Sequence, residues 1–141
     1  APGGGTTDYA VSIYHDALQT GHHTCFLGEG TVLPMLYMPD ALKATLDIMH
    51  APAESIKIRT SYNLAGMSFG PEEIAASIAK FVPGFTISYE PDSRQAIANS
   101  WPAVIDDGRA TEDWGWKPDY DLDRMTEDML KNLRPQYSVK G

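Results

Sequence analysis

The spacing of hydrophobic residues along the chain changes between two periods, one typical of helices and one typical of strands. The helical period, with apolar residues three or four positions apart, occurs in segments 8–20, 40–51, 71–82 and 121–133. Short apolar runs typical of strands lie between these segments, at 24–27, 32–38, 58–64 and 85–89. The pattern predicts an α/β chain in which helices and short strands alternate.

Several residues predict where the helices begin and end. Gly21 is placed to end the first helix, and Asp40 is placed to cap the second. Pro71 opens the third, and Asp121 caps the last. A further short helix follows residues 106–107 and ends near Trp114. The second helix carries one apolar stripe, made of Leu42, Thr45, Leu46 and Met49.

The predicted strands are too few and too short to form a complete doubly wound sheet. They resemble a minor sheet, accompanied by about four main helices, that is added to something larger. We expect residues 1–135 to form one structural portion and residues 136–141 to be a frayed tail. We also expect this portion to expose apolar surface, which a further domain would cover or a second copy would hide.

Composition narrows the class of protein. The 141 residues are 43% hydrophobic and 21% charged, which is an ordinary globular balance, and the net charge is −8. An acidic surface argues against nucleic acid and anionic membranes as partners. No apolar run approaches the roughly 18 residues that a membrane span needs. The N-terminus lacks an initiator Met and the features of a signal peptide, which suggests a processed or excised chain.

The single cysteine, Cys25, excludes an intrachain disulfide. His22 and His23 precede it, but neither CxxC nor HxxxH spacing supports a metal site. We therefore interpret Cys25 as a residue packed in a short strand and expect no metal.

Five segments together resemble one enzyme family, the L-threonine dehydrogenases of the short-chain type. This family is part of the extended, epimerase-like short-chain dehydrogenases, and the resemblance covers nearly the whole chain as their C-terminal half. The segments are PGGGTTDYA (2–10), LPMLYMPDALKAT (33–45), SYNLAGMSFGPEEIA (61–75), YEPDSRQAIANSWPAVIDD (89–107) and DWGWKPDYDLDRMTEDMLKNL (113–133).

The resemblance implies NAD-dependent oxidation of L-threonine to 2-amino-3-oxobutanoate. Such an enzyme needs a glycine-rich turn between a strand and a helix for the dinucleotide, and a Tyr-x-x-x-Lys pair for proton abstraction. No such glycine turn occurs here, and none of the seven tyrosines has a lysine four residues later. We therefore expect no catalytic or cofactor-binding residue in this chain, and no activity without an upstream Rossmann half. The full-length protein is expected to be a homodimer, cytoplasmic in a bacterium or mitochondrial in a eukaryote.

The segment Gly3–Thr7 leads into the first helix and has two interpretations. Local physics favours a flexible entry followed by a threonine N-cap. The resemblance instead implies that a threonine here contacts the substrate, whose carboxylate suits backbone N–H groups at a helix N-terminus. We select Thr6, with Thr7 as the close second and Gly5 as part of the same site.

Trp101 lies in a predicted loop and also has two interpretations. Without context a tryptophan is more often a core residue. The resemblance implies that this loop closes over the amino acid, where the indole would exclude water and form an apolar wall beside the substrate methyl group.

Other conspicuous residues are interpreted as structural. Asp92 and Arg94 are expected to pair with each other, and Asp106 and Asp107 to cap a helix. The rest are Trp114 and Trp116, expected to pack in the interior, and Glu72 and Glu73, expected to face the helix dipole.

Two rival functions remain. A nucleotide-sugar epimerase or reductase of the same group would bind a diphosphate, which the eleven Lys and Arg residues and the acidic balance argue against. A non-catalytic amino-acid-binding module would have no Rossmann half at all.

Overall fold

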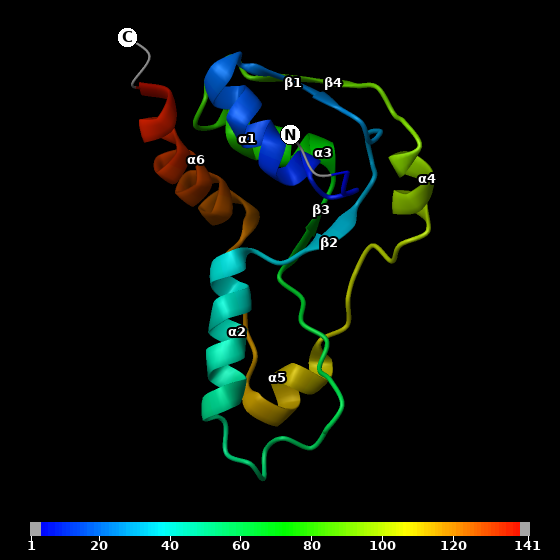
Figure 1. Cartoon of the computed structure of the whole chain (residues 1–141), viewed down its shortest axis with the longest axis vertical. Helices are drawn as coiled ribbons and strands as arrows, with labels where there is room; N and C mark the ends of the chain where they lie inside the picture. The colour runs from blue at the N-terminus through cyan, green and yellow to red at the C-terminus, as the bar shows by residue number, and fades with distance from the viewer. Residues whose placement is uncertain (1–3, 139–141) are drawn as a thin grey trace.

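The computed structural model describes residues 4–138 of the chain, which form two lobes (Figure 1). The elements in chain order are α1 (Tyr9–Gln19), β1 (His22–Cys25), β2 (Leu33–Met35), α2 (Met38–His50), β3 (Met67–Phe69), α3 (Pro71–Ala79), β4 (Thr86–Tyr89), α4 (Arg94–Asn99), α5 (Gly108–Trp114) and α6 (Leu122–Ser138). The prediction of a small α/β fold without a complete doubly wound sheet is confirmed, with six described helices rather than about four.

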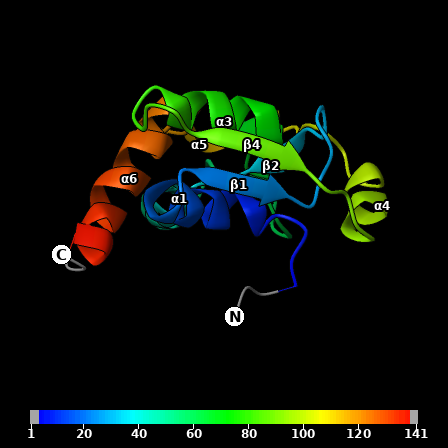
Figure 2. The same cartoon turned by 90° about the horizontal axis from the view of Figure 1, so that it is seen from above.

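The first lobe is built around two short sheets. Strands β1 and β4 pair in parallel, with His22 opposite Thr86, and β2 pairs antiparallel with β3, with Leu33 opposite Phe69. Figure 2 shows β1 and β4 side by side with α1 and α3 next to them. Helix α6 packs across α1 and α3, so that three helices and the sheets enclose one apolar core.

The second lobe is formed by α2, α5 and the connection 51–66 (Figure 1). Its small core contains Ala44, Ala110 and Trp116, all nearly fully buried. Trp116 donates a hydrogen bond from its indole Nε1 to the carbonyl oxygen of Ala65 at 3.1 Å. The interpretation of Trp114 and Trp116 as packing residues is confirmed, since the two rings lie 6.0 Å apart, Trp116 is 2% exposed and Trp114 packs partly buried against the same core.

The prediction that Asp40 caps the second helix is wrong. Helix α2 begins at Met38, with Tyr37 as its N-cap, so Asp40 lies inside the first turn. Its fully buried carboxylate accepts backbone N–H groups from Asp119 at 2.8 Å and Tyr120 at 3.1 Å. The side chain therefore satisfies donors of a distant segment rather than those of its own helix.

The apolar stripe of α2 faces solvent. Leu42, Leu46 and Met49 are 60%, 54% and 72% exposed, and Thr45 is exposed as well. The buried face of the helix instead carries Asp40 and Ala44. A helix in a small lobe contacts neighbours on one side only, and here that side is the face with the smaller and more polar residues.

The strand predicted at residues 58–64 does not form. Tyr62 and Leu64 pack against the second core, but this segment has no ladder partner among the described residues, and the observed strand is β3 at Met67–Phe69. A strand requires a neighbouring strand for its backbone hydrogen bonds, so an alternating pattern is insufficient on its own.

Most of the remaining local predictions are confirmed. Gly21 has φ of +72° after α1, Cys25 is buried in β1, and the Asp121 carboxylate accepts the N–H of Arg124 at 2.8 Å at the start of α6. Helix α4 was not predicted. Helix α6 includes residues 136–138, while residues 139–141 of the expected tail lie outside the described range. None of the helices in residues 4–138 combines the length and apolar character needed to cross a membrane.

Candidate functional site

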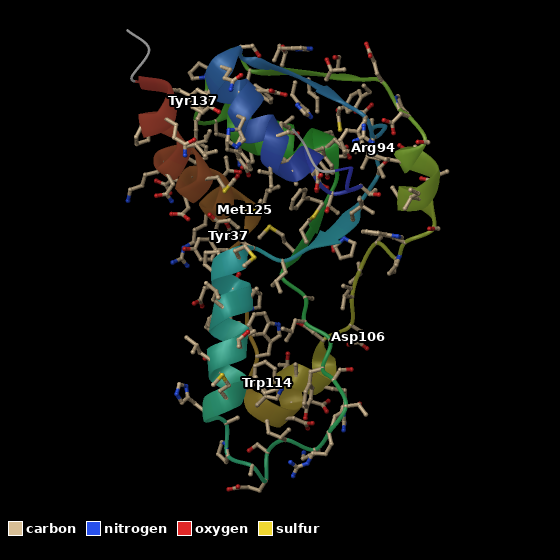
Figure 3. The ribbon with its side chains drawn as sticks, in the orientation of Figure 1. Tyr37, Arg94, Asp106, Trp114, Met125 and Tyr137 are labelled. Atoms are coloured by element: carbon tan, nitrogen blue, oxygen red, sulfur yellow. The ribbon has the colours of Figure 1, made fainter. Side chains whose placement is uncertain are left out.

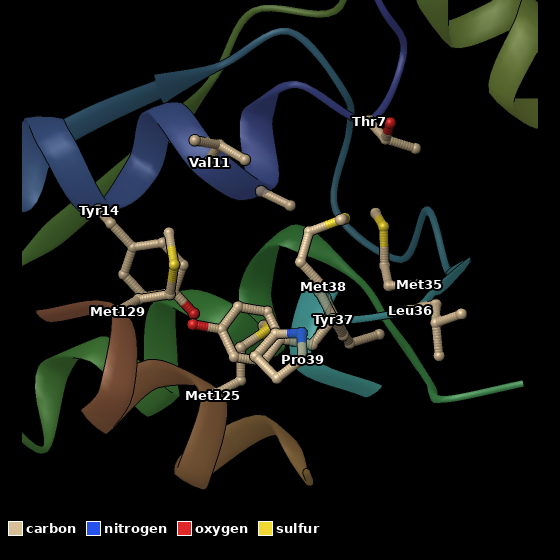
Figure 4. Close-up of a pocket in the computed structure, with 12 residues that line it drawn as sticks. Thr7, Val11, Tyr14, Met35, Leu36, Tyr37, Met38, Pro39, Met125 and Met129 are labelled. Carbon is tan, nitrogen blue, oxygen red and sulfur yellow. The ribbon is translucent and has the colours of Figure 1, made fainter. Parts of the chain in front are cut away.

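A cavity of about 470 Å³ lies between α1, β2, α2 and α6 (Figure 4). The turn before α1 contributes Thr7 to its wall, and α6 contributes Met125 and Met129. The full lining consists of Thr7, Ala10, Val11, Tyr14, Met35, Leu36, Tyr37, Met38, Pro39, Phe69, Met125 and Met129. The cavity joins elements from both ends of the chain, which only the tertiary fold brings together.

The lining is mostly apolar, and its two tyrosine hydroxyls are bonded to protein partners. The Tyr37 hydroxyl donates to Oδ2 of Asp128 at 2.8 Å. The Tyr14 hydroxyl is hydrogen-bonded to Oγ1 of Thr126 at 3.0 Å, and Ser77 donates to the same oxygen at 2.9 Å. Thr7, by contrast, lines the cavity and makes no side-chain hydrogen bond to any residue from 4 to 138.

Neither tyrosine is suited to act as a general base. Burial raises the pKa of Tyr14 to about 12, partly opposed by the Thr126 hydrogen bond. Burial, followed by the hydrogen bond to Asp128, raises the pKa of Tyr37 well above its usual range. A base near neutral pH needs a lowered tyrosine pKa, so the cavity can receive and position a ligand but supplies no proton acceptor.

The approach to α1 is a tight turn held by Asp8. Oδ2 of Asp8 accepts the backbone N–H of Gly5 at 3.0 Å, and the Gly5 carbonyl accepts the N–H of Asp8 at 3.3 Å. A Cβ atom at position 5 would lie 2.7 Å from Oδ1 of Asp8, so the reciprocal bonding requires glycine. Gly3 lies outside the described residues.

The turn separates the two threonines. Thr7 lines the cavity, whereas Thr6 is only 7% exposed and is not part of the wall. The threonine N-cap that local physics predicted is wrong, because Asp8 is the N-cap residue of α1 and the helix start has no side-chain cap hydrogen bond. The freed hydroxyl of Thr7 points to a role other than capping.

Trp101 follows the end of α4 and is 44% exposed, outside the wall of the cavity. Its backbone N–H donates to the carbonyl of Ala98 at 3.1 Å, which fixes the start of the loop 101–107. The structure thus places Thr7 on the cavity and Trp101 on a separate, exposed loop.

The predicted pairing of Asp92 with Arg94 is confirmed. Arg94 (labelled in Figure 3) binds the carboxylate through Nε at 3.0 Å and through Nη2 at 2.5 Å, while its guanidinium lies over the ring of Phe26. The Arg94 side chain holds the pKa of Asp92 below its usual range. The two charged groups pair with each other, and neither lines the cavity.

The predicted capping role of the Asp106–Asp107 pair is confirmed for Asp106. Its Oδ1 accepts the N–H of Gly108, the first residue of α5, at 2.9 Å, while Asp107 bonds the N–H of Ala65 at 3.3 Å. The first-turn position predicted for Glu72 and Glu73 is also confirmed, since both lie at the start of α3. No group of three or more His, Cys, Asp or Glu side chains within residues 4–138 is arranged to hold a metal ion.

The described residues do not fit a dinucleotide. Such a site needs a strand that runs through a glycine turn into a helix with free N–H groups. The junction of β3 and α3 contains Gly70, but its N–H is taken by Oε2 of Glu73 at 2.8 Å. The carboxylate of Glu72 lies beside the same glycine and would repel a pyrophosphate.

Sequence reasoning missed most of the cavity wall. Met35, Met38, Met125 and Met129 contribute four flexible apolar side chains, which adapt readily to irregular shapes. The abundance of methionine, six in 141 residues, was the one available signal. It did not show that these four converge, because Met35 and Met129 are far apart in the chain.

No family model matches the chain. Among curated proteins, it is 54% identical over 130 residues to the mitochondrial L-threonine 3-dehydrogenase of Sus scrofa, which covers 92% of this chain and 35% of that protein. It is 50% identical over 140 residues to an uncharacterized epimerase/dehydratase of Staphylococcus haemolyticus, which covers 99% of this chain and 44% of that protein. The chain therefore spans well under half the length of these relatives.

Solved structures give the same result. The L-threonine dehydrogenase of Phytophthora infestans superimposes with a TM-score of 0.92 at 53% identity, over 96% of this chain and 44% of the other. The GalE-like L-threonine dehydrogenase of Cupriavidus necator in its apo form gives 0.89 at 59% identity, over 94% and 48%. The chain therefore matches one part of these enzymes in both sequence and fold, over nearly its whole length.

Proposed function

Because the chain is similar over nearly its whole length to the C-terminal part of L-threonine 3-dehydrogenases of the GalE-like, short-chain type, we propose that it is the substrate-binding portion of such an enzyme. The reaction is the NAD-dependent oxidation of the 3-hydroxyl of L-threonine to give 2-amino-3-oxobutanoate. The single observation that carries the proposal is the agreement in sequence and fold with solved threonine dehydrogenases, 53% identical at a TM-score of 0.92 for the Phytophthora enzyme.

The chain's part in this reaction is to bind and orient the amino acid. NAD, when bound, accepts the hydride, and the residues present here do not fit it, so an upstream half must hold it. The raised pKa values of Tyr14 and Tyr37 support assigning the base to that half as well. The isolated chain is therefore inactive.

The amino-acid site is formed by the turn before α1. Thr7 offers an unpaired hydroxyl on the cavity wall, and the Gly5–Thr6 backbone supports it from the turn. The neighbouring apolar wall suits the methyl group of threonine. Trp101 closes over the ligand when its exposed loop folds inward, which excludes water from the reacting carbon.

The decisive experiment compares the full-length protein with this chain. We expect the full-length protein to form NADH with L-threonine, whereas residues 1–141 alone form none. A full-length variant in which the Tyr-x-x-x-Lys lysine of the upstream half is replaced should be inactive while it still binds threonine. A full-length protein that is folded, binds NAD and leaves L-threonine unchanged would refute the proposal.

The staphylococcal relatives, named epimerase/dehydratase and 46–50% identical, favour one alternative. An epimerase of this group would bind a nucleotide sugar. The net charge of −8 and the apolar cavity argue against a diphosphate ligand. Tighter binding of a nucleotide sugar than of threonine by the full-length protein would favour the alternative.

Assembly and location are proposed from the same resemblance. The full-length protein is proposed to be a homodimer. The relatives from Sus scrofa and Bos taurus are named mitochondrial, so we assign this protein to the mitochondrion if its source is a eukaryote and to the cytoplasm if it is a bacterium.

A further inference from the structure

Helix α2 presents a row of large apolar side chains to solvent. Met38, Leu42, Leu46 and Met49 follow one another at helical spacing and are 64%, 60%, 54% and 72% exposed. An isolated exposed leucine is ordinary, but a continuous row on one face of a helix marks an interaction surface.

One exposed apolar side chain of α1 lies on the wall of the cavity that α2 also lines. Val11 is 52% exposed, and it lines the same cavity as Met38 (Figure 4). We call the five residues Val11, Met38, Leu42, Leu46 and Met49 the α2 apolar surface. It starts at the rim of the candidate amino-acid site and runs the length of α2.

The apolar face of α2 takes no part in the packing of residues 4–138. Its opposite face carries Ala44, which is 1% exposed, and Asp40, which is bonded to the backbone of Asp119. The amphipathic pattern of the helix is therefore complete only if something outside residues 4–138 covers its apolar side.

We propose that the α2 apolar surface is the docking surface for the upstream, cofactor-carrying half of the same protein. This inference rests on the proposed function and adds the place where the two halves meet. The relatives supply a segment of sufficient size, since the match covers 35% of the Sus scrofa enzyme and leaves 65% of it unmatched.

The position of the surface favours the upstream half over a second copy of the chain. Hydride transfer requires the cofactor and substrate carbons to come within about 3–3.5 Å, so the half that carries the cofactor must lie against the mouth of the amino-acid site. Val11 and Met38 are both on the wall of that site and on the α2 apolar surface. An upstream half that lies against the mouth of the amino-acid site therefore also covers the α2 apolar surface.

Thiol labelling of the full-length protein tests the proposal. Leu46→Cys and Met49→Cys each place a reporter on the α2 apolar surface. Glu112→Cys is the control, since Glu112 is 67% exposed and lies on α5, in the same lobe but outside that surface. Cys25 is fully buried. Because a covered thiol reacts only when the structure opens, we expect both reporters to be labelled roughly tenfold or more slowly than the control in site-resolved mass spectrometry.

Three results are informative. Slow labelling that does not change with protein concentration supports docking within one molecule. Labelling of both reporters as fast as the control overturns the proposal, as does protection that is lost on dilution, which would identify a second copy as the occupant. Two reporters guard against one substitution that disturbs folding.

The outcome is separable from that of the proposed function. Protection of the reporters in a full-length protein that oxidises no threonine would leave the docking surface standing and reject the substrate. Threonine oxidation together with freely labelled reporters would support the proposed substrate and reject the docking surface.

Discussion

Oδ1 of Asp40, inside α2, accepts the backbone N–H of Asp119 at 2.8 Å across 79 residues of sequence. Oδ2 of the same carboxylate accepts the N–H of Tyr120 at 3.1 Å. Residues 119–120 lead directly into α6, so one buried side chain ties the second lobe to a helix of the first. The cavity lies between these two helices and depends on their spacing.

Asp40→Ala should lower the stability of the protein markedly. It removes two part-buried hydrogen bonds, from the N–H groups of Asp119 and Tyr120, at roughly 1 kcal/mol each, and it empties the place of a fully buried side chain. Chemical denaturation of the full-length protein measures the change. Asp47→Ala on the same helix is the control, because its exposed ion pair with Lys43 should contribute no more than about 1 kcal/mol. Equal effects of the two substitutions would contradict the assigned role of Asp40.

Asp113 should make stability depend on pH in the acid range. The hydrogen bond from Tyr62 at 2.7 Å, followed by Lys57 at 3.2 Å, holds the pKa of Asp113 below its ordinary value of 3.8. A lowered pKa gives a contribution that is complete above pH 3.8 and disappears as the pH falls through the lowered value.

The measurement compares wild type with Asp113→Asn. The stability difference between them should be largest near neutral pH and should shrink as the pH falls below 3.8. A difference that stays constant with pH would show that Asp113 acts through its shape and not its charge.

Thr7→Val in the full-length enzyme should raise KM for L-threonine about tenfold, the equivalent of one hydrogen bond of about 1.4 kcal/mol. The reason is that Thr7 has the free hydroxyl on the cavity wall. Thr6→Val is the matched variant and should leave KM nearly unchanged, since Thr6 is buried in the turn. Steady-state kinetics decide between the two, and the reverse result would assign the substrate contact to Thr6.

Trp101→Ala should reduce the preference for threonine over serine. The apolar wall beside the substrate methyl is worth about 1–3 kcal/mol in kcat/KM, and removing the indole should remove most of it. Val104→Ala, in the same exposed loop, is the control and should leave the preference unchanged. An unaltered ratio in Trp101→Ala would mean that the loop never closes over the substrate.

Predictions from the sequence succeeded where the physics is local. The turn at Gly21, the Asp121 cap of α6 and the short helix ending near Trp114 all depend on residues a few positions apart, and all are present. The predictions failed where the partner is distant. Asp40 has the sequence signature of a cap but bonds residues 119–120, and the alternating run 58–64 has no strand beside it within the described chain.

The candidate site divides in the same way. The segment Gly5–Thr7 could be selected from the sequence, but which threonine faces the cavity depends on how the turn is held by Asp8. The methionines of the wall could not be selected at all, because they come from β2, α2 and α6 and meet only in the folded protein.

By itself the sequence determined that the chain holds amphipathic helices and short strands, and that it contains neither a Tyr-x-x-x-Lys pair nor a dinucleotide turn. These properties are fixed by residue types at short spacing. Only the tertiary structure decided which face each helix buries. The apolar stripe of α2 is plain in the sequence, yet it faces outward, because the direction of burial is set by the neighbours that a helix finds and not by its own periodicity.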